Sequence, residues 1–214
     1  VSNGDVGLEG AESVEKAHNY TGNNHGGMVE LGDQWYIFYH RMTNRNQFSR
    51  QCCAEPVEIL PDGKILQAEV TSCGLNGGPL PAVGEYRAGG TCFYAPRTSG
   101  EKVKEEHPYL TQENGDDSCE ESQYIANLRN HAWAGFRYFA FTGQEKEIVV
   151  TMRGGASGKL LFSTDRGKET VAVLEVEPSE GWTSAGTVLK VSAGKLPLYM
   201  VFEGKGALNV KGFT

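Results

Sequence analysis

Apolar and polar residues alternate along residues 28 to 31 and again along residues 34 to 40, with Gly32-Asp33 between the two runs. Alternation of this kind indicates strands with one face toward a core, and a two-residue Gly-Asp loop tolerates the positive φ that closes a tight hairpin. The pattern recurs over residues 51 to 59 and 64 to 70, around Pro61-Asp62-Gly63. Four antiparallel strands in about 45 residues are typical of one propeller blade, which cannot bury both faces of its sheet alone.

Glycine and proline interrupt this pattern in TSCGLNGGPLPAVGEYRAGG, residues 71 to 90, which indicates a linker and places a domain boundary within residues 74 to 90. Nine short runs with strand character follow: 91 to 96, 123 to 128, 134 to 141, 146 to 153, 158 to 164, 170 to 176, 186 to 191, 197 to 203 and 207 to 213. Their spacing of about 8 to 12 residues predicts a jelly-roll-like β-sandwich of about 120 residues. The acidic run over residues 105 to 122 is interpreted as a solvated loop, and no long helix is expected. The predicted fold class is all-β.

The composition supports this picture and limits the partners. The chain has 214 residues, 39% of them apolar, and 28 scattered glycines, which suits a core built from short strands and tight turns. A net charge of −7 with dispersed Lys and Arg argues against a nucleic-acid partner. No apolar run approaches the roughly 18 residues that span a bilayer, so no membrane partner is expected. Five cysteines without a CxxC pair argue against a zinc site and a complete disulfide framework.

The segments SNGDVG, NYTGNNHGGMVE, WYIFYHR and FSRQCCAEPVEI follow one another within residues 2 to 59. In this order they resemble the last part of the glycoside hydrolase family 43 enzymes, five-bladed β-propellers that cleave arabinose or xylose linkages in plant polysaccharides. The resemblance covers roughly residues 1 to 85. It implies that a plant polysaccharide or oligosaccharide is the partner, and that this segment is the last blade of a partial propeller whose missing N-terminal blades precede residue 1.

The resemblance places His25, in the loop NNHGG, at the propeller axis beneath the active site. There it would ligate a central metal ion, calcium or another divalent ion, because a neutral imidazole can hold a metal or a water through one nitrogen. The alternative is a histidine whose ring nitrogens form hydrogen bonds with backbone groups of the loop. The resemblance also implies that Arg50 reaches the sugar-binding subsite, where a guanidinium offers several donors to hydroxyls. The alternative for Arg50 is a surface salt bridge, and His40 and Arg41 are weaker candidates.

No catalytic residue is assigned. Inverting glycosidases use two carboxyl groups, a general acid and a general base, spaced to admit a water. In the family these groups precede the part that this chain resembles. Glu9, Glu12 and Glu15 lie in a polar loop and Glu30 alternates within a strand, so none is interpreted as catalytic. We therefore expect this chain alone not to hydrolyse a glycoside.

From about residue 91, the motifs QYIANLRNHAWAGFRYFAF, SEGW and YMVFEGKGALNVKGF resemble a family 6 carbohydrate-binding module, a β-sandwich. In that family a cleft among loops holds a sugar between two aromatic faces, with an asparagine donating hydrogen bonds. The resemblance implies Trp133 and Trp182 as the aromatics and Asn209 as the amide. Indole faces pack on the C–H faces of sugars, and amides pair with hydroxyls. The alternative for Trp133 and Trp182 is that both are core residues. The alternative for Asn209 is that its side chain forms a hydrogen bond with a nearby backbone group.

The chain departs from the family near its end, where Asn209-Val210-Lys211-Gly212 replaces an Asn-x-Asp-Trp pattern. A cation then stands where a carboxylate helps to hold structural calcium, and the tryptophan that usually follows Trp182 is replaced near Ala185.

Two functions follow from these resemblances. In the first, residues 1 to 85 belong to a glycoside hydrolase propeller and residues 86 to 214 are its carbohydrate-binding module. In the second, the chain is a non-catalytic protein that binds xylan-type glycans through the sandwich. The sequence leaves the cellular location open; for a full-length enzyme of this kind we expect secretion or a periplasmic location.

Overall fold

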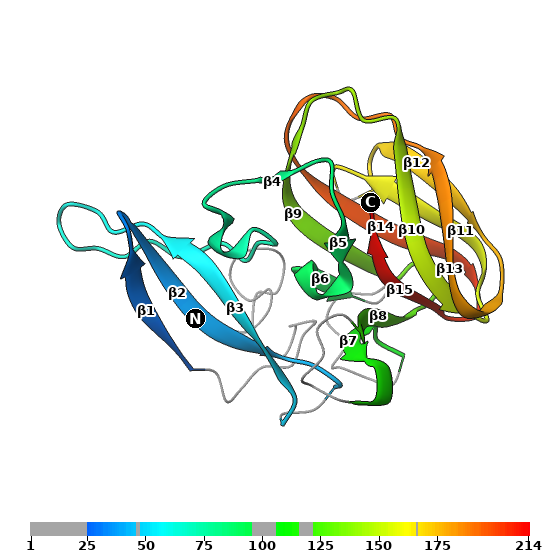
Figure 1. Cartoon of the computed structure of the whole chain (residues 1–214), viewed down its shortest axis with the longest axis horizontal. Helices are drawn as coiled ribbons and strands as arrows, with labels where there is room; N and C mark the ends of the chain where they lie inside the picture. Colours follow the sequence, from blue (N-terminus) through cyan, green and yellow to red (C-terminus); the bar gives the residue numbers. More distant parts are fainter. Residues whose placement is uncertain (1–24, 46–47, 96–105, 116–121, 166) are drawn as a thin grey trace.

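The structure is a computed structural model, and it describes residues 25–45, 48–95, 106–115, 122–165 and 167–214. The expectations that concern residues 1–24, including those for Glu9, Glu12 and Glu15, lie outside these ranges. Figure 1 shows a small sheet at one end of the long axis and a larger two-sheet body at the other.

The small sheet, here called the blade, contains β1 (Gly26–Leu31), β2 (Gln34–Met42) and β3 (Arg50–Val57) in the order β1-β2-β3. Its first hairpin closes where Leu31 pairs with Gln34, and Gly32 adopts a positive φ of 63° there. The predicted hairpin and the third strand are confirmed. The fourth strand expected over residues 64 to 70 is wrong, because after one isolated bridge between Ile59 and Ile65 the chain leaves the blade toward the sandwich.

Two six-stranded sheets form the predicted sandwich, with mainly antiparallel pairing. The first sandwich sheet has the order β13-β10-β15-β8-β7, with β5 paired to β15. Its strands are β5 (Tyr86–Arg87), β7 (Tyr109–Gln112), β8 (Gln123–Leu128), β10 (Glu147–Gly154), β13 (Ser179–Val188) and β15 (Leu208–Phe213).

The second sandwich sheet has the order β12-β11-β14-β9-β4, with β6 paired to β9. Its strands are β4 (Leu80–Pro81), β6 (Phe93–Ala95), β9 (Trp133–Phe141), β11 (Ser157–Ser163), β12 (Thr170–Val176) and β14 (Gly194–Lys205). Because β4 pairs with β9 and β5 pairs with β15, the sandwich uses residues on both sides of the predicted boundary at residue 85.

The main core lies between the two sandwich sheets. It includes Ile125, Val150, Met152 and Val210 from the first sheet and Phe136, Leu160, Phe162, Met200 and Phe202 from the second. Alternation along each strand places these side chains inward and their neighbours outward, which gives each sheet an outer face with different chemistry. The acidic run contributes to this body as well, because β7 buries Leu110 and Gln112; for these residues the expectation of a solvated loop is wrong.

Helical structure among the described residues is limited to short 3-10 segments: η2 (Gly74–Asn76), η3 (Ala88–Gly90), η4 (Glu113–Gly115) and the single residue Ser122. In the part of the chain that the structure describes, none of the helical segments has the length and apolar character needed to cross a membrane.

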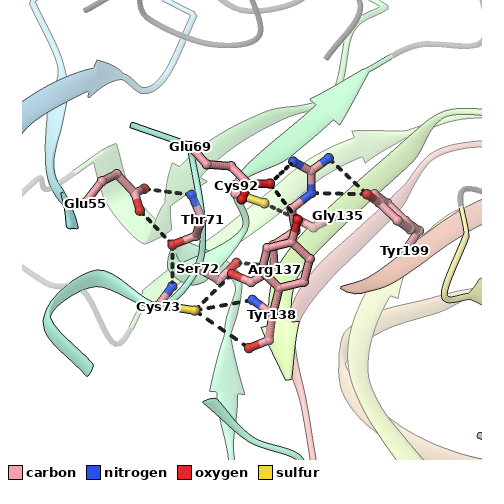
Figure 2. Close-up of polar contacts among 10 residues, drawn as sticks. All are labelled: Glu55, Glu69, Thr71, Ser72, Cys73, Cys92, Gly135, Arg137, Tyr138 and Tyr199. Atoms are coloured by element: carbon pink, nitrogen blue, oxygen red, sulfur yellow. Dashed lines mark hydrogen bonds and ion pairs between the residues drawn. The ribbon is translucent and has the colours of Figure 1, made fainter. Parts of the chain in front are cut away.

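A hydrogen-bonded network joins the linker to both bodies (Figure 2). On the blade side, the Thr71 backbone N–H and hydroxyl donate to the Glu55 carboxyl group, at 2.7 and 2.6 Å. On the sandwich side, the Arg137 guanidinium and the Tyr138 hydroxyl donate to Glu69 Oε1, at 3.1 and 2.6 Å. Residues 69 to 71, where the linker begins, are therefore hydrogen-bonded to both the blade and the sandwich.

Candidate functional site

The residues predicted from the propeller resemblance gather at one end of the blade. His25 is exposed immediately before β1, and its ring contacts the ring of His40 on β2 edge to face, with centroids 4.6 Å apart. Arg50 is the exposed first residue of β3 and pairs with Met42 at the end of β2. The fold thus places His25, His40 and Arg50 at the same end of one three-stranded sheet.

The described residues do not complete a metal site around His25. Where the chain is described, there is no group of three or more His, Cys, Asp or Glu side chains that could hold an ion. Calcium prefers six to eight oxygen ligands, whereas His25 and His40 offer imidazole nitrogens. A metal at this end of the blade would need further ligands from residues beyond those described.

Trp133 lies on the face of the second sandwich sheet that is turned toward the linker. It begins β9, where it pairs with Val201 of β14 and Ala95 of β6. Its ring is half-buried against Tyr199 and Phe93, with centroids 6.0 and 6.5 Å away. Trp133 therefore packs among aromatic residues beside the linker.

Trp182 and Asn209 lie on the first sandwich sheet. Trp182 belongs to β13, and its Nε1–H donates to Glu113 Oε1 at 3.0 Å. Asn209 belongs to β15 and accepts a hydrogen bond from the Asn127 backbone N–H at 3.0 Å. The structure brings Trp182 and Asn209 to the same sheet, but it does not bring Trp133 into a common cleft with them.

The aromatic side chain that does lie beside Trp182 is Tyr124 of β8. The two rings meet edge to face with centroids 5.3 Å apart. Arg153 of β10 contacts both, with its guanidinium carbon 4.2 Å from the Trp182 ring centroid and 5.0 Å from that of Tyr124. Sequence reasoning missed Tyr124 and Arg153. In EIVVTMRG, the apolar residues Ile148, Val150 and Met152 recur at every second position, which was a sequence signal for the outward orientation of Arg153; QYIANL has no such regular alternation.

Glu55 is a buried carboxyl group whose pKa is shifted far from its ordinary value. Burial raises its pKa to about 7 against the opposing effect of hydrogen bonds from Thr71 and Tyr39. A raised carboxyl pKa in a cavity is a feature of general acids, and Glu55 lines a cavity of about 150 Å³ together with Cys53 and Cys92. Its oxygens already accept two hydrogen bonds from Thr71 and one from Tyr39, so the structure gives it a role in holding the linker.

Comparison with known proteins gives the following matches. No protein-family model matches this chain. A curated xylosidase/arabinosidase from Thermoclostridium stercorarium is 40% identical over 222 residues, covering 100% of this chain and 46% of that protein. The chain therefore spans about half the length of the curated relative that it matches.

Solved structures support the fold of both parts. A glycoside hydrolase family 43 arabinoxylan arabinofuranohydrolase from Bacillus subtilis, solved with cellotetraose, matches with a TM-score of 0.60 at 18% identity, over 91% of this chain and 41% of that one. A β-1,3-glucan binding family 6 module from Bacillus halodurans matches with a TM-score of 0.51 at 14% identity, over 64% of this chain and 98% of the module. The predicted all-β fold, a propeller part followed by a β-sandwich, is confirmed. The chain is thus similar in sequence to a xylosidase/arabinosidase, and its fold resembles a glycoside hydrolase family 43 propeller part followed by a family 6 carbohydrate-binding module.

Proposed function

We propose that this chain is part of a glycoside hydrolase that acts on arabinose- or xylose-containing plant polysaccharides. The observation that carries the proposal is the 40% identity to a xylosidase/arabinosidase along the whole chain. In the proposed enzyme the blade completes a propeller, and the general acid and general base of an inverting mechanism come from residues outside this chain.

Within that enzyme, the end of the blade faces the substrate. Arg50 begins a strand there and is exposed, so its guanidinium can direct several N–H donors at sugar hydroxyls. His25 is the proposed ligand of a divalent ion near the propeller axis, with the other ligands supplied from outside the described residues. The adjoining His40 ring limits how the His25 ring can turn, which would keep one imidazole nitrogen directed away from the sheet.

Co-production of this chain with the part of the Thermoclostridium stercorarium relative that it does not match tests the proposal. We expect the purified complex, but not the chain alone, to hydrolyse aryl arabinofuranosides or aryl xylosides. Arg50→Ala should lower kcat/KM by about 10- to 100-fold, the usual range for a lost substrate hydrogen bond from a charged group. Lys159→Ala, on the exposed side of the second sandwich sheet, is the matched control and should leave kcat/KM unchanged. A folded, stoichiometric complex without activity on either substrate would contradict the proposal.

A second function is a carbohydrate-binding protein without catalysis of its own. The outer face of the first sandwich sheet favours it, because Trp182, Tyr124 and Asn209 gather there, and aromatic rings with a few amides are the usual lining of sugar sites. Titration calorimetry of the full chain with xylo- and arabino-oligosaccharides should give a Kd in the micromolar to millimolar range, about −8 to −4 kcal/mol. Trp182→Ala should abolish the heat of binding, whereas Trp133→Phe, at the linker face, should retain it.

A further inference from the structure

The outer face of the first sandwich sheet is cationic around Trp182. On β10, Met152 is buried in the core, so Arg153 points outward; on β15, Val210 is buried, so Lys211 points outward. The Lys211 ammonium lies 5.9 Å from the centroid of the Trp182 ring. Two cations therefore accompany the tryptophan on a chain whose net charge is −7.

Arg153 is already paired with a carboxylate of the chain itself. Its guanidinium lies over the Trp182 ring and beside the Tyr124 ring, and it forms an ion pair with Glu113 at 2.9 Å. The Trp182 Nε1–H donates to the same Glu113 oxygen at 3.0 Å. A guanidinium held by two rings has little freedom left to lose when it binds an anion. The same contact covers a face of Trp182, so a neutral sugar could stack there only after Arg153 moved away.

Lys211 extends this cationic surface into an adjoining cavity. The cavity has a volume of about 500 Å³, within the range of small-ligand sites. Its lining includes the cations Arg87 and Lys211, the acidic residue Glu85, and the hydroxyl residues Thr151, Ser184 and Thr214. The Thr151 and Ser184 hydroxyls lie 2.9 Å apart, so they can exchange their mutual hydrogen bond for sugar hydroxyls. Where the structure describes the chain, Lys211 forms no ion pair, and its ammonium stands at the border between the cavity and Trp182.

We propose that this groove, from Trp182 to the cavity lined by Lys211 and Arg87, binds a glycan that carries uronic acid residues. The inference rests on the proposed ability of the sandwich to bind glycans and defines their chemical class. Lys211 pairs with the uronate carboxylate, and Arg87 adds positive potential from β5. Thr151 and Ser184 receive hydroxyls of the same sugar, and the exposed edge of Trp182 contacts the next residue of the glycan. The Arg153–Glu113 pair stays in place and keeps a neutral ring from entering between the two aromatic residues.

Calorimetry of the full chain with two matched oligosaccharides tests this inference. One probe is xylotetraose and the other is xylotriose substituted with one glucuronic acid. In about 50 mM salt we expect the acidic probe to bind about tenfold more tightly than xylotetraose. A gain of this size is what one partly desolvated charge pair, here Lys211 with the uronate carboxylate, contributes to binding. The preference should decrease in about 500 mM salt, because the Debye length falls below the dimensions of the groove.

Lys211→Met is the decisive variant, because it keeps the aliphatic stem and removes the charge. It should reduce affinity for the acidic probe to that for the neutral probe, whereas Lys159→Met, on an exposed ion pair of the other sheet, should change neither. Equal affinities for the two probes in the unmodified chain would overturn the inference and leave glycan binding intact. Binding of neither probe would instead contradict glycan binding by the sandwich itself. Tighter xylotetraose binding by Arg153→Gln, with no acidic preference in the unmodified chain, would show that Arg153 blocks a neutral-sugar site and would likewise overturn it.

Discussion

Glu55 shows how a single carboxyl group couples the blade to the linker. Its side chain is 2% exposed, and burial raises its pKa to about 7 although Thr71 and Tyr39 donate hydrogen bonds to it. The folded state therefore holds this proton more tightly than the unfolded chain, whose glutamates titrate near their ordinary value. Stability from this group is complete below the unfolded pKa and is lost as the pH rises through about 7.

Glu55→Gln should remove this part of the pH dependence. Between about pH 5 and pH 8, the unmodified chain should lose up to about 3 kcal/mol of unfolding free energy through this group, and the variant should lose correspondingly less. The glutamine amide oxygen can still accept from the Thr71 backbone N–H, so the variant should fold. Denaturant unfolding at a series of pH values measures the difference. Glu58→Gln, an exposed carboxyl near the end of the same strand, is the control; a parallel pH profile for all three proteins would rule out the role given to Glu55.

At the scale of single residues, the sequence was a better guide to the blade than to the sandwich site. Because a hairpin fixes its own register, the loop at Gly32-Asp33 was enough to bring His25 and His40 to the same end of the blade. Trp133 and Trp182 lie on different sheets, and their relation depends on long-range pairing that no local pattern encodes. Similarity of motif alone could not separate Trp133, packed on Tyr199, from Tyr124, which faces Trp182.

At the scale of elements, strands that bury one apolar face were predictable. The expected runs over residues 123 to 128 and 170 to 176 coincide with β8 and β12, where apolar side chains recur at the buried positions. The run expected over residues 186 to 191 has the wrong bounds, because β13 covers Ser179–Val188 and shares only residues 186 to 188 with it. That strand is at the edge of its sheet and seven of its ten residues are Ser, Thr, Gly or Glu, so neither propensity nor alternation marked it.

The strand β7 was missed for a different reason. It lies within an acidic run, yet it pairs with β8 over Tyr109 to Gln112 and buries Leu110 completely. The run over residues 105 to 122 was judged by its overall acidic composition, which concealed the four residues of β7 whose side chains alternate between half-buried and buried. The same stretch supplies Glu113, which follows β7 directly and pairs with Arg153, so the missed strand also concealed one wall of the candidate site.

At the scale of the whole molecule, polar contacts join the blade to the sandwich in the part of the chain that the structure describes. Arg41 on β2 donates to the Thr91 and Gly89 carbonyls next to η3, the latter at 2.8 Å, and its Nε–H donates to Gln51 at 2.9 Å. Gln51 in turn donates to the Gly89 carbonyl at 3.0 Å. Since η3 is the end of the linker and precedes β6 of the second sandwich sheet, Arg41 connects the blade to the residues where the linker enters the sandwich.

Arg41→Met should weaken this connection without unfolding either body. The two carbonyls would lose their charged donor, at a cost of about 1–3 kcal/mol. Because β1 to β3 form a small sheet with little core of its own, the cost should appear as faster opening of the blade, while the sandwich retains the core between its two sheets.

Hydrogen exchange followed by mass spectrometry should show increased exchange in residues 26 to 57 and unchanged exchange in β9, β11 and β14. Arg50→Met, at the exposed start of β3, is the matched control, and its blade should exchange as in the unmodified chain. If Arg41→Met accelerated exchange equally in both bodies, the blade and the sandwich would form one cooperative unit, and Arg41 would stabilise the molecule as a whole instead of joining two separately stable parts.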